Sequence, residues 1–179
     1  MATCDLTLGR KIPCKDNVGG IKNIYFLNYN DVPYEKMTIV DEEISLFAAS
    51  GTPSIEAYKY ELIGAQSLEE TNEISIDNGT SFWTQVLTAI LQKQDKVTQK
   101  ELKLASFGNP KIMIEDYLGN LRFMGAQLGC MVAVNVVSGA NKTDLNGYNI
   151  TATATENGPA LYVADTAYQQ LTIIEGTNS

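Results

Sequence analysis

The stretch Tyr148-Asn-Ile-Thr-Ala-Thr-Ala-Thr155 decides the fold class of this chain. Its even-numbered positions are Tyr, Ile or Ala, whereas its odd-numbered positions are all Asn or Thr. Successive side chains of a β-strand point to opposite faces, so this alternation predicts a strand with one face on a core and the other on water or a neighbouring molecule.

Strand signals continue on both sides of this stretch. The turn sequence Asp77-Asn-Gly79 precedes Phe82–Leu91, whose β-branched residues and period-two alternation favour a long strand. Thr38–Phe47 fits either a hairpin or a loop that becomes ordered only against a partner. Further strands are expected at Ile21–Tyr29, Ser54–Leu62, Leu68–Ile76, Lys111–Glu115, Leu121–Met124 and Cys130–Val137.

One helix interrupts the strands. Thr98-Gln-Lys-Glu101 fits a capping box, Val97 and Leu102 are placed as its apolar staple, and Gly108 follows the far end. These signals predict a short helix at about Thr98–Phe107 that lies on an open edge of the strands. The fold class is therefore predicted to be mainly β, a sandwich or barrel with one short flanking helix.

The chain of 179 residues is long enough for one domain with a sizeable core. No linker, repeat or low-complexity segment divides it, so we predict a single domain over residues 1–179. Residues 1–20 are expected to form an N-terminal arm, and residues 160–179 a C-terminal arm or a terminal strand.

The residue types that most enzymes need are scarce. The chain has no histidine, and its three cysteines, Cys4, Cys14 and Cys130, follow no metal-ligand spacing. Free thiols are the favoured interpretation, and a Cys4–Cys14 bridge is the alternative. The acidic pair Glu69-Glu70 does not converge on one site, because neighbouring strand residues face opposite ways. We therefore expect no catalytic site, cofactor or metal.

The charge argues against tight binding of nucleic acid. The net charge is −8, from 21 acidic and 13 basic residues, and the chain has only two arginines. Lys and Arg supply most of the affinity for phosphates. The start of the chain lacks a basic or apolar run and no segment approaches the roughly 20 apolar residues of a membrane span. We expect synthesis in the cytoplasm and no membrane insertion.

Several segments, taken in order, resemble the tail tube proteins of tailed bacteriophages. They are Tyr58–Leu62, Asn78–Phe82, Lys100–Leu104, Ile114–Asn120, Asp144–Tyr148 and Glu156–Pro159. The resemblance runs from about Ile21 to Val163. It implies a virion structural protein, in which six subunits close a ring and rings stack into a conduit for DNA ejection. The implied partners are other copies, neighbouring tail proteins and passing DNA.

The resemblance also suggests which residues make contacts. Asn149, Thr151 and Thr153, or else the acidic residues, are candidates to face the lumen. The loop at about Thr38–Pro53, with Asp41, Glu42 and Glu43, is the candidate for contacts with the next ring. The alternatives are a related ring protein, such as a tail terminator or a neck adaptor, and a capsid-decorating module.

Overall fold

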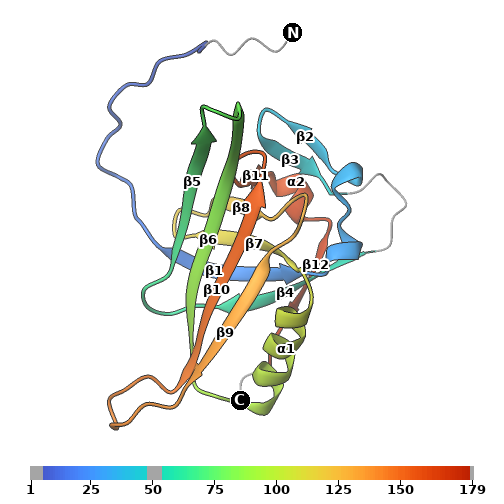
Figure 1. The fold of residues 1–179 in the computed structure, drawn as a ribbon. Coiled ribbons are helices and arrows are strands. Elements are labelled where there is room, and N and C mark those ends of the chain that lie inside the picture. The colour runs from blue at the N-terminus through green and yellow to red at the C-terminus, as the bar shows by residue number, and fades with distance from the viewer. Residues whose placement is uncertain (1–5, 48–53, 178–179) are drawn as a thin grey trace.

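The computed structural model describes residues 6–47 and 54–177, which form two β-sheets (Figure 1). The eight-stranded sheet has the order β12-β4-β1-β7-β8-β11-β3-β2, with β1 (Ile21–Leu27), β2 (Thr38–Val40), β3 (Glu43–Leu46), β4 (Ile55–Glu61), β7 (Lys111–Asp116), β8 (Leu121–Met124), β11 (Leu161–Val163) and β12 (Leu171–Glu175). The four-stranded sheet has the order β5-β6-β10-β9, with β5 (Ser67–Ser75), β6 (Thr80–Gln92), β9 (Met131–Val137) and β10 (Gly147–Glu156).

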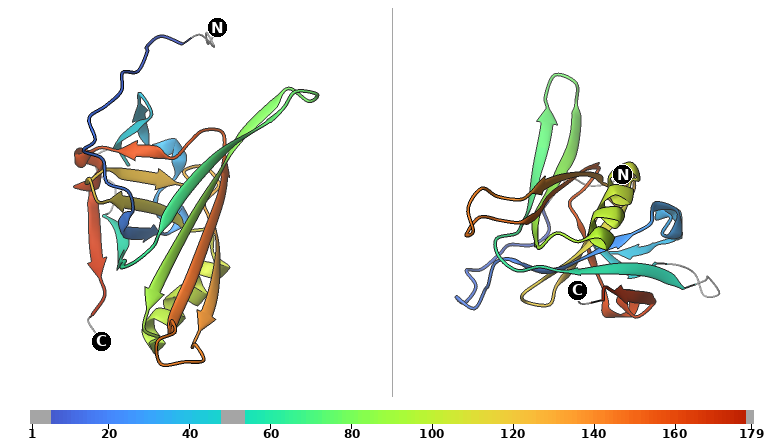
Figure 2. Two further views of the ribbon diagram at one scale, coloured as in Figure 1. Left: turned by 90° about the vertical axis from the view of Figure 1, so that its left-hand side faces the viewer. Right: turned by 90° about the horizontal axis from the view of Figure 1, so that it is seen from below.

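The mainly-β prediction is confirmed, but the barrel alternative is wrong. Within the described residues the two sheets stay separate and face each other, and neither closes on itself (Figure 2). The reason lies in the pairing, because β5 and β9 each have one partner strand and end their sheet. Among the described strands, the four-stranded sheet therefore has two edges without a partner strand.

The strands follow the local patterns closely. The Asp77-Asn-Gly79 turn joins β5 to β6, and the hairpin of β7 and β8 forms as expected. The Thr38–Phe47 segment is a hairpin, in which β2 and β3 are antiparallel. The rest of the Thr38–Pro53 loop, residues 48–53, lies outside the described residues.

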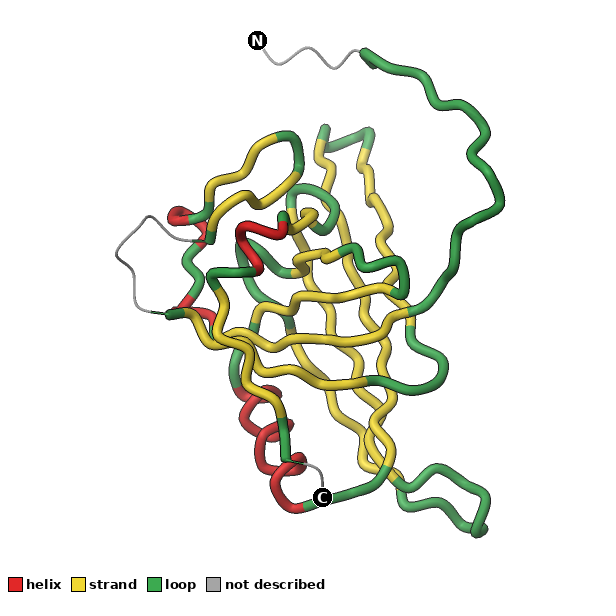
Figure 3. Tube along the Cα trace, turned by 180° about the vertical axis from the view of Figure 1, so that it is seen from behind, coloured by secondary structure: helices red, strands yellow, loops and turns green. Residues whose placement is uncertain are grey.

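Two hydrophobic cores hold the sheets. The first lies between the sheets and contains Leu87, Ile112, Tyr148 and Ile150, all with no exposed surface. The second lies on the far face of the eight-stranded sheet, where the β2–β3 hairpin and α2 (Asp165–Tyr168) cover it (Figure 3). Each large side chain buried in these cores stabilises the fold by about 1.5–3 kcal/mol.

The main helix, α1 (Lys96–Phe107), begins two residues before the predicted Thr98. Asp95 is the N-cap in place of Thr98, because its Oδ1 accepts a hydrogen bond from the Thr98 amide at 2.8 Å. The hydrogen bonds from Thr98 lower the pKa of Asp95. The prediction of one helix is also incomplete, since the structure adds α2 and two single-turn 3-10 helices, η1 (Tyr29–Asp31) and η2 (Tyr34–Lys36).

The two ends of the chain behave differently. Residues 6–20 are exposed, form neither helix nor strand, and extend away from the sheets (Figure 1). The C-terminal segment instead returns to the eight-stranded sheet, where β12 pairs in parallel with β4 and forms the edge. None of the helices within the described residues combines the length and apolar character needed to cross a bilayer.

Candidate functional site

The outer face of the four-stranded sheet, pointing away from the core, carries the three predicted lumen residues. Asn149, Thr151 and Thr153 lie on β10, an interior strand, between β6 and β9. Tyr148, Ile150, Ala152 and Ala154 point to the opposite side and are buried, which confirms the predicted alternation. The structure thus places the three residues on one surface, together with side chains of all four strands.

The outer face is polar and carries no basic side chain. All four strands are described, and alternation assigns these positions to the outer face: Ser67, Glu69, Thr71, Glu73, Ser75, Thr80, Phe82, Thr84, Val86, Thr88, Ile90, Gln92, Met131, Ala133, Asn135, Val137, Asn149, Thr151, Thr153 and Thr155. Hydroxyl and amide groups predominate, and two glutamates supply its only charge. A phosphate backbone would find no counter-charge here.

The sheet is staggered along its strands. In the paired register, Ser67, Thr88, Thr151 and Ala133 lie at one level. Measured along the strands from this row of four residues, the centre of β5, Thr71, is displaced by four residues toward the β5–β6 turn. The centre of β9, Val134, is displaced by one residue in the opposite direction. The centres of the two edge strands are therefore offset by about five residues.

The predicted inter-ring residues lie at the turn between β2 and β3. Asp41 and Glu42 form the two-residue turn, with φ of 51° and 63°, and Glu43 begins β3. This left-handed backbone favours Asn and Gly, so an Asp-Glu pair is costly here. The turn lies at the same end of the molecule as the β5–β6 hairpin tip (Figures 1 and 2).

Two buried charged side chains, Lys111 and Glu156, hold the loop of residues 125–129, and neither was predicted from the sequence as a functional residue. Lys111 is 1% exposed, and its Nζ donates to the carbonyls of Val32 at 2.7 Å and Ala126 at 2.6 Å. Glu156 accepts hydrogen bonds from the amides of Gln127 and Leu128, both at 3.1 Å. Burial lowers the pKa of Lys111 and raises that of Glu156. Nothing in the local sequence marks these residues, because both occupy strand positions.

Glu70 connects the two sheets. It lies on the inner side of β5 and forms an ion pair with Arg122 on β8, and its Oε2 accepts a hydrogen bond from the Ala160 amide at 2.7 Å. Its neighbour Glu69 lies on the outer face. The predicted divergence of this acidic pair is therefore confirmed.

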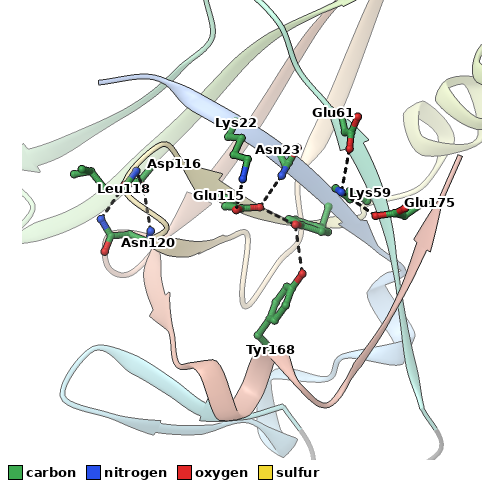
Figure 4. Close-up of polar contacts among 11 residues, drawn as sticks. Lys22, Asn23, Lys59, Glu61, Glu115, Asp116, Leu118, Asn120, Tyr168 and Glu175 are labelled. Carbon is green, nitrogen blue, oxygen red and sulfur yellow. Dashed lines mark hydrogen bonds and ion pairs between the residues drawn. The ribbon is translucent and has the colours of Figure 1, made fainter. Parts of the chain in front are cut away.

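A polar cluster around Glu115 lies on the eight-stranded sheet (Figure 4). Glu115 accepts hydrogen bonds from Asn23 at 2.7 Å and Tyr25 at 2.8 Å, and Lys22 lies 3.5 Å away. Burial alone would raise the pKa of Glu115, but these hydrogen bonds outweigh it and lower the pKa. Tyr25 also approaches Tyr168 of α2 at 3.5 Å. The cluster thus joins β1, β7 and α2 through a saturated carboxylate, which suits a structural role.

The cysteines and acidic residues form no chemical centre within the described chain. No three Cys, Asp or Glu side chains of that part gather closely enough to hold a metal ion. Cys14 is exposed and Cys130 is buried, and both are free thiols, as the favoured interpretation expected; Cys4 lies outside the described residues. Burial raises the pKa of the Cys130 thiol to about 12, so this thiol is protonated at neutral pH.

No family model, curated protein or solved structure matches this chain.

Proposed function

We propose that this protein is a virion structural protein whose copies join by their four-stranded sheets into six-membered rings, which stack into the tail tube of a bacteriophage. The observation that carries the proposal is the four-stranded sheet itself. It combines two free edges, a stagger between those edges, and an outer face without basic side chains.

The free edges can join without disturbing the pairing pattern. The strands alternate in direction across β5, β6, β10 and β9, so β5 and β9 are antiparallel to each other. Placing β9 of one copy beside β5 of the next therefore continues an antiparallel sheet. The two edges differ in sequence, so the contact is head-to-tail and closes a ring when the rotation fits. Closure would remove edges that are otherwise open to chance pairing.

The stagger fits the strand tilt of a barrel. To centre β5 of one copy on β9 of its neighbour, one copy has to move along the strand direction by about five residues relative to the other. The shift must be an even number of residues, because an odd shift would pair outer-face residues of one copy with inner-face residues of the other. A shift of four or six residues over four strands gives a tilt of about 35° or about 47°, from a rise of ~3.4 Å and a strand spacing of ~4.8 Å. Barrel strands are typically tilted by about 35–45°.

The resulting channel would suit the passage of DNA. Six copies of a four-stranded sheet at the smaller tilt give a backbone diameter of roughly 45 Å. Asn149, Thr151 and Thr153 would then face the lumen. Because no outer-face lysine or arginine would hold a phosphate, a duplex could slide past. The turn at Asp41, Glu42 and Glu43 is our candidate for the contact between stacked rings.

The test is electron microscopy of the purified protein with a matched pair of variants. We expect six-fold rings or tubes from the wild type. Val136 is on the inner side of β9 and half-exposed in the single chain, so Val136→Lys should fold but bury a charge under the incoming strand and stay monomeric. Asn135→Lys, on the outer face, should still close rings.

The other results discriminate between classes of protein. Rings that never stack would point to a tail terminator or neck adaptor. A wild type that stays monomeric at high concentration would overturn the proposal and favour a decorating module. Rings from Val136→Lys would show that the β9 edge is not the joint.

A further inference from the structure

Helix α1 presents an apolar and basic face that no other described part of the chain covers. All of α1 is described, and Leu102, 1% exposed, is its one buried residue. Phe107 is 77% exposed, and Val97 and Leu104 are more than half exposed. At about 100° per residue, Phe107 falls within roughly 40° of Lys96, Lys100 and Lys103, on the side opposite Leu102. A phenylalanine this exposed among lysines is unusual for a helix that only seals a core.

The β5–β6 hairpin has the complementary character. Ile74 is 68% exposed and Ile76 is 92% exposed. Ile74 pairs with Ser81 and lies on the inner side of the sheet, which packs on the core elsewhere. Ile74 is exposed because the end of the hairpin extends beyond the core (Figure 2). The hairpin from Ser67 to Gln92 has four acidic residues and no basic ones, and one of them, Asp77, lies in the exposed turn beside Ile76. Helix α1 has three lysines and one glutamate.

The two surfaces lie at matching positions along the edge strands. Helix α1 packs against β9 and runs alongside it (Figures 1 and 2). Just beyond its end, the Pro110 carbonyl accepts a hydrogen bond from the Cys130 amide at 2.9 Å, at the start of β9. If β5 of a second copy pairs with β9, Ile74 of that copy falls opposite Cys130 for the four-residue shift, or opposite Val132 for the six-residue shift. Either position is beside the Phe107 end of the helix.

We propose that α1 is the receiving surface for the β5–β6 hairpin of a second copy of this chain. Ile74 and Ile76 of the incoming hairpin pack on Phe107 and Leu104, and the acidic hairpin is attracted to the basic helix. The inference rests on the proposed edge-to-edge ring and adds a second contact to it. Burial of apolar area supplies the affinity between the two copies, and the opposite charges determine which surfaces meet and in which orientation.

Cross-linking tests the contact directly. Ile74→Cys and Phe107→Cys are introduced together in a Cys4→Ser, Cys14→Ser background, where the buried Cys130 thiol is left in place. A short bismaleimide should convert this protein into a ladder of oligomers on a denaturing gel. Each single-cysteine variant should give no ladder, and neither should Ile74→Cys paired with Gln99→Cys, because Gln99 lies at the other end of α1.

Charge reversal tests the attraction. We expect K100E/K103E to raise the protein concentration needed for half-assembly at least tenfold, and D77K, in the turn beside Ile76, to raise it in the same direction. The three substitutions combined should restore assembly, because opposite charges face each other again. Circular dichroism should show the same folded spectrum for all three, since these side chains are exposed.

The outcomes separate this inference from the ring proposal. A ladder with rescue supports the contact. Rings that form without a ladder, and that tolerate both reversals, overturn the contact and leave the ring proposal intact. A wild type without rings whose cysteine pair still cross-links supports the contact and overturns the ring. If neither rings nor cross-links form, both proposals are overturned.

Discussion

Replacing Glu70 by alanine should show how strongly the two sheets are connected. The substitution removes the acceptor of the Ala160 amide and the ionic partner of Arg122. A hydrogen bond to a charged group contributes about 1.5–3 kcal/mol. The Arg122 side chain is 31% exposed, so solvent screens the ion pair and its share is about 0.2–1 kcal/mol. Together these losses predict a fall of about 2–4 kcal/mol in the unfolding free energy.

Urea unfolding, followed by the fluorescence of Trp83, measures this loss. The chain has one tryptophan, on β6, the strand that pairs with β5. The protein should be diluted until it is monomeric, because assembly would add to its apparent stability. Glu69→Ala is the matched control, and we expect it to change the free energy by no more than about 0.5 kcal/mol, since Glu69 is exposed.

A double-mutant cycle with Arg122→Met separates the two contributions. The coupling energy between Glu70 and Arg122 should not exceed about 1 kcal/mol, with the rest due to the Ala160 amide. If Glu70→Ala costs no more than Glu69→Ala, the connection between the sheets contributes nothing and the reasoning fails.

Three further changes have defined outcomes. Burial raises the pKa of Glu156, so above about pH 4.5 the folded chain keeps a proton on this carboxyl group that the unfolded chain releases. The unfolding free energy should therefore fall as pH rises from about 4.5. Denaturation at several pH values measures this fall, which should be absent in Glu156→Gln. Asp95→Ala should lower the unfolding free energy by about 0.5–2 kcal/mol and speed amide exchange in the first turn of α1, whereas Asp95→Asn should preserve most of the cap. Asp41→Asn with Glu42→Gly should raise the unfolding free energy by roughly 0.5–1 kcal/mol in thermal unfolding, since the turn needs positive φ. If this turn contacts the next ring, the same double variant should form shorter tubes despite its greater stability.

Local sequence patterns predicted the strands well because the signal for a strand with two unlike faces lies within the strand itself. The alternation at Tyr148–Thr155 and the Asp77-Asn-Gly79 turn needed no knowledge of distant residues. The start of α1 was wrong by two residues, because Asp95 and Thr98 can both act as caps. The backbone of Asp95 is extended, with φ of −145°, so the earlier cap is used.

The candidate site was only partly predictable for a related reason. The polar face of β10 could be seen in the sequence, but its neighbours on β5, β6 and β9 depend on which strands pair. The role of Lys111 could not be foreseen, because its two carbonyl partners, Val32 and Ala126, come from separate loops. The parallel pairing of β12 with β4 was likewise hidden, since it joins distant parts of the chain.

That pairing sets an order of events during synthesis. Lys59 of β4 and Glu175 of β12 form an ion pair at 2.9 Å, although they are 116 residues apart. At a translation rate of roughly 5–20 residues per second, β4 leaves the ribosome on the order of ten seconds before its partner exists. The outer edge of β4 therefore stays unpaired in every nascent chain. The step that completes the eight-stranded sheet has to wait for β12 and closes a long loop, so it is expected to be slow.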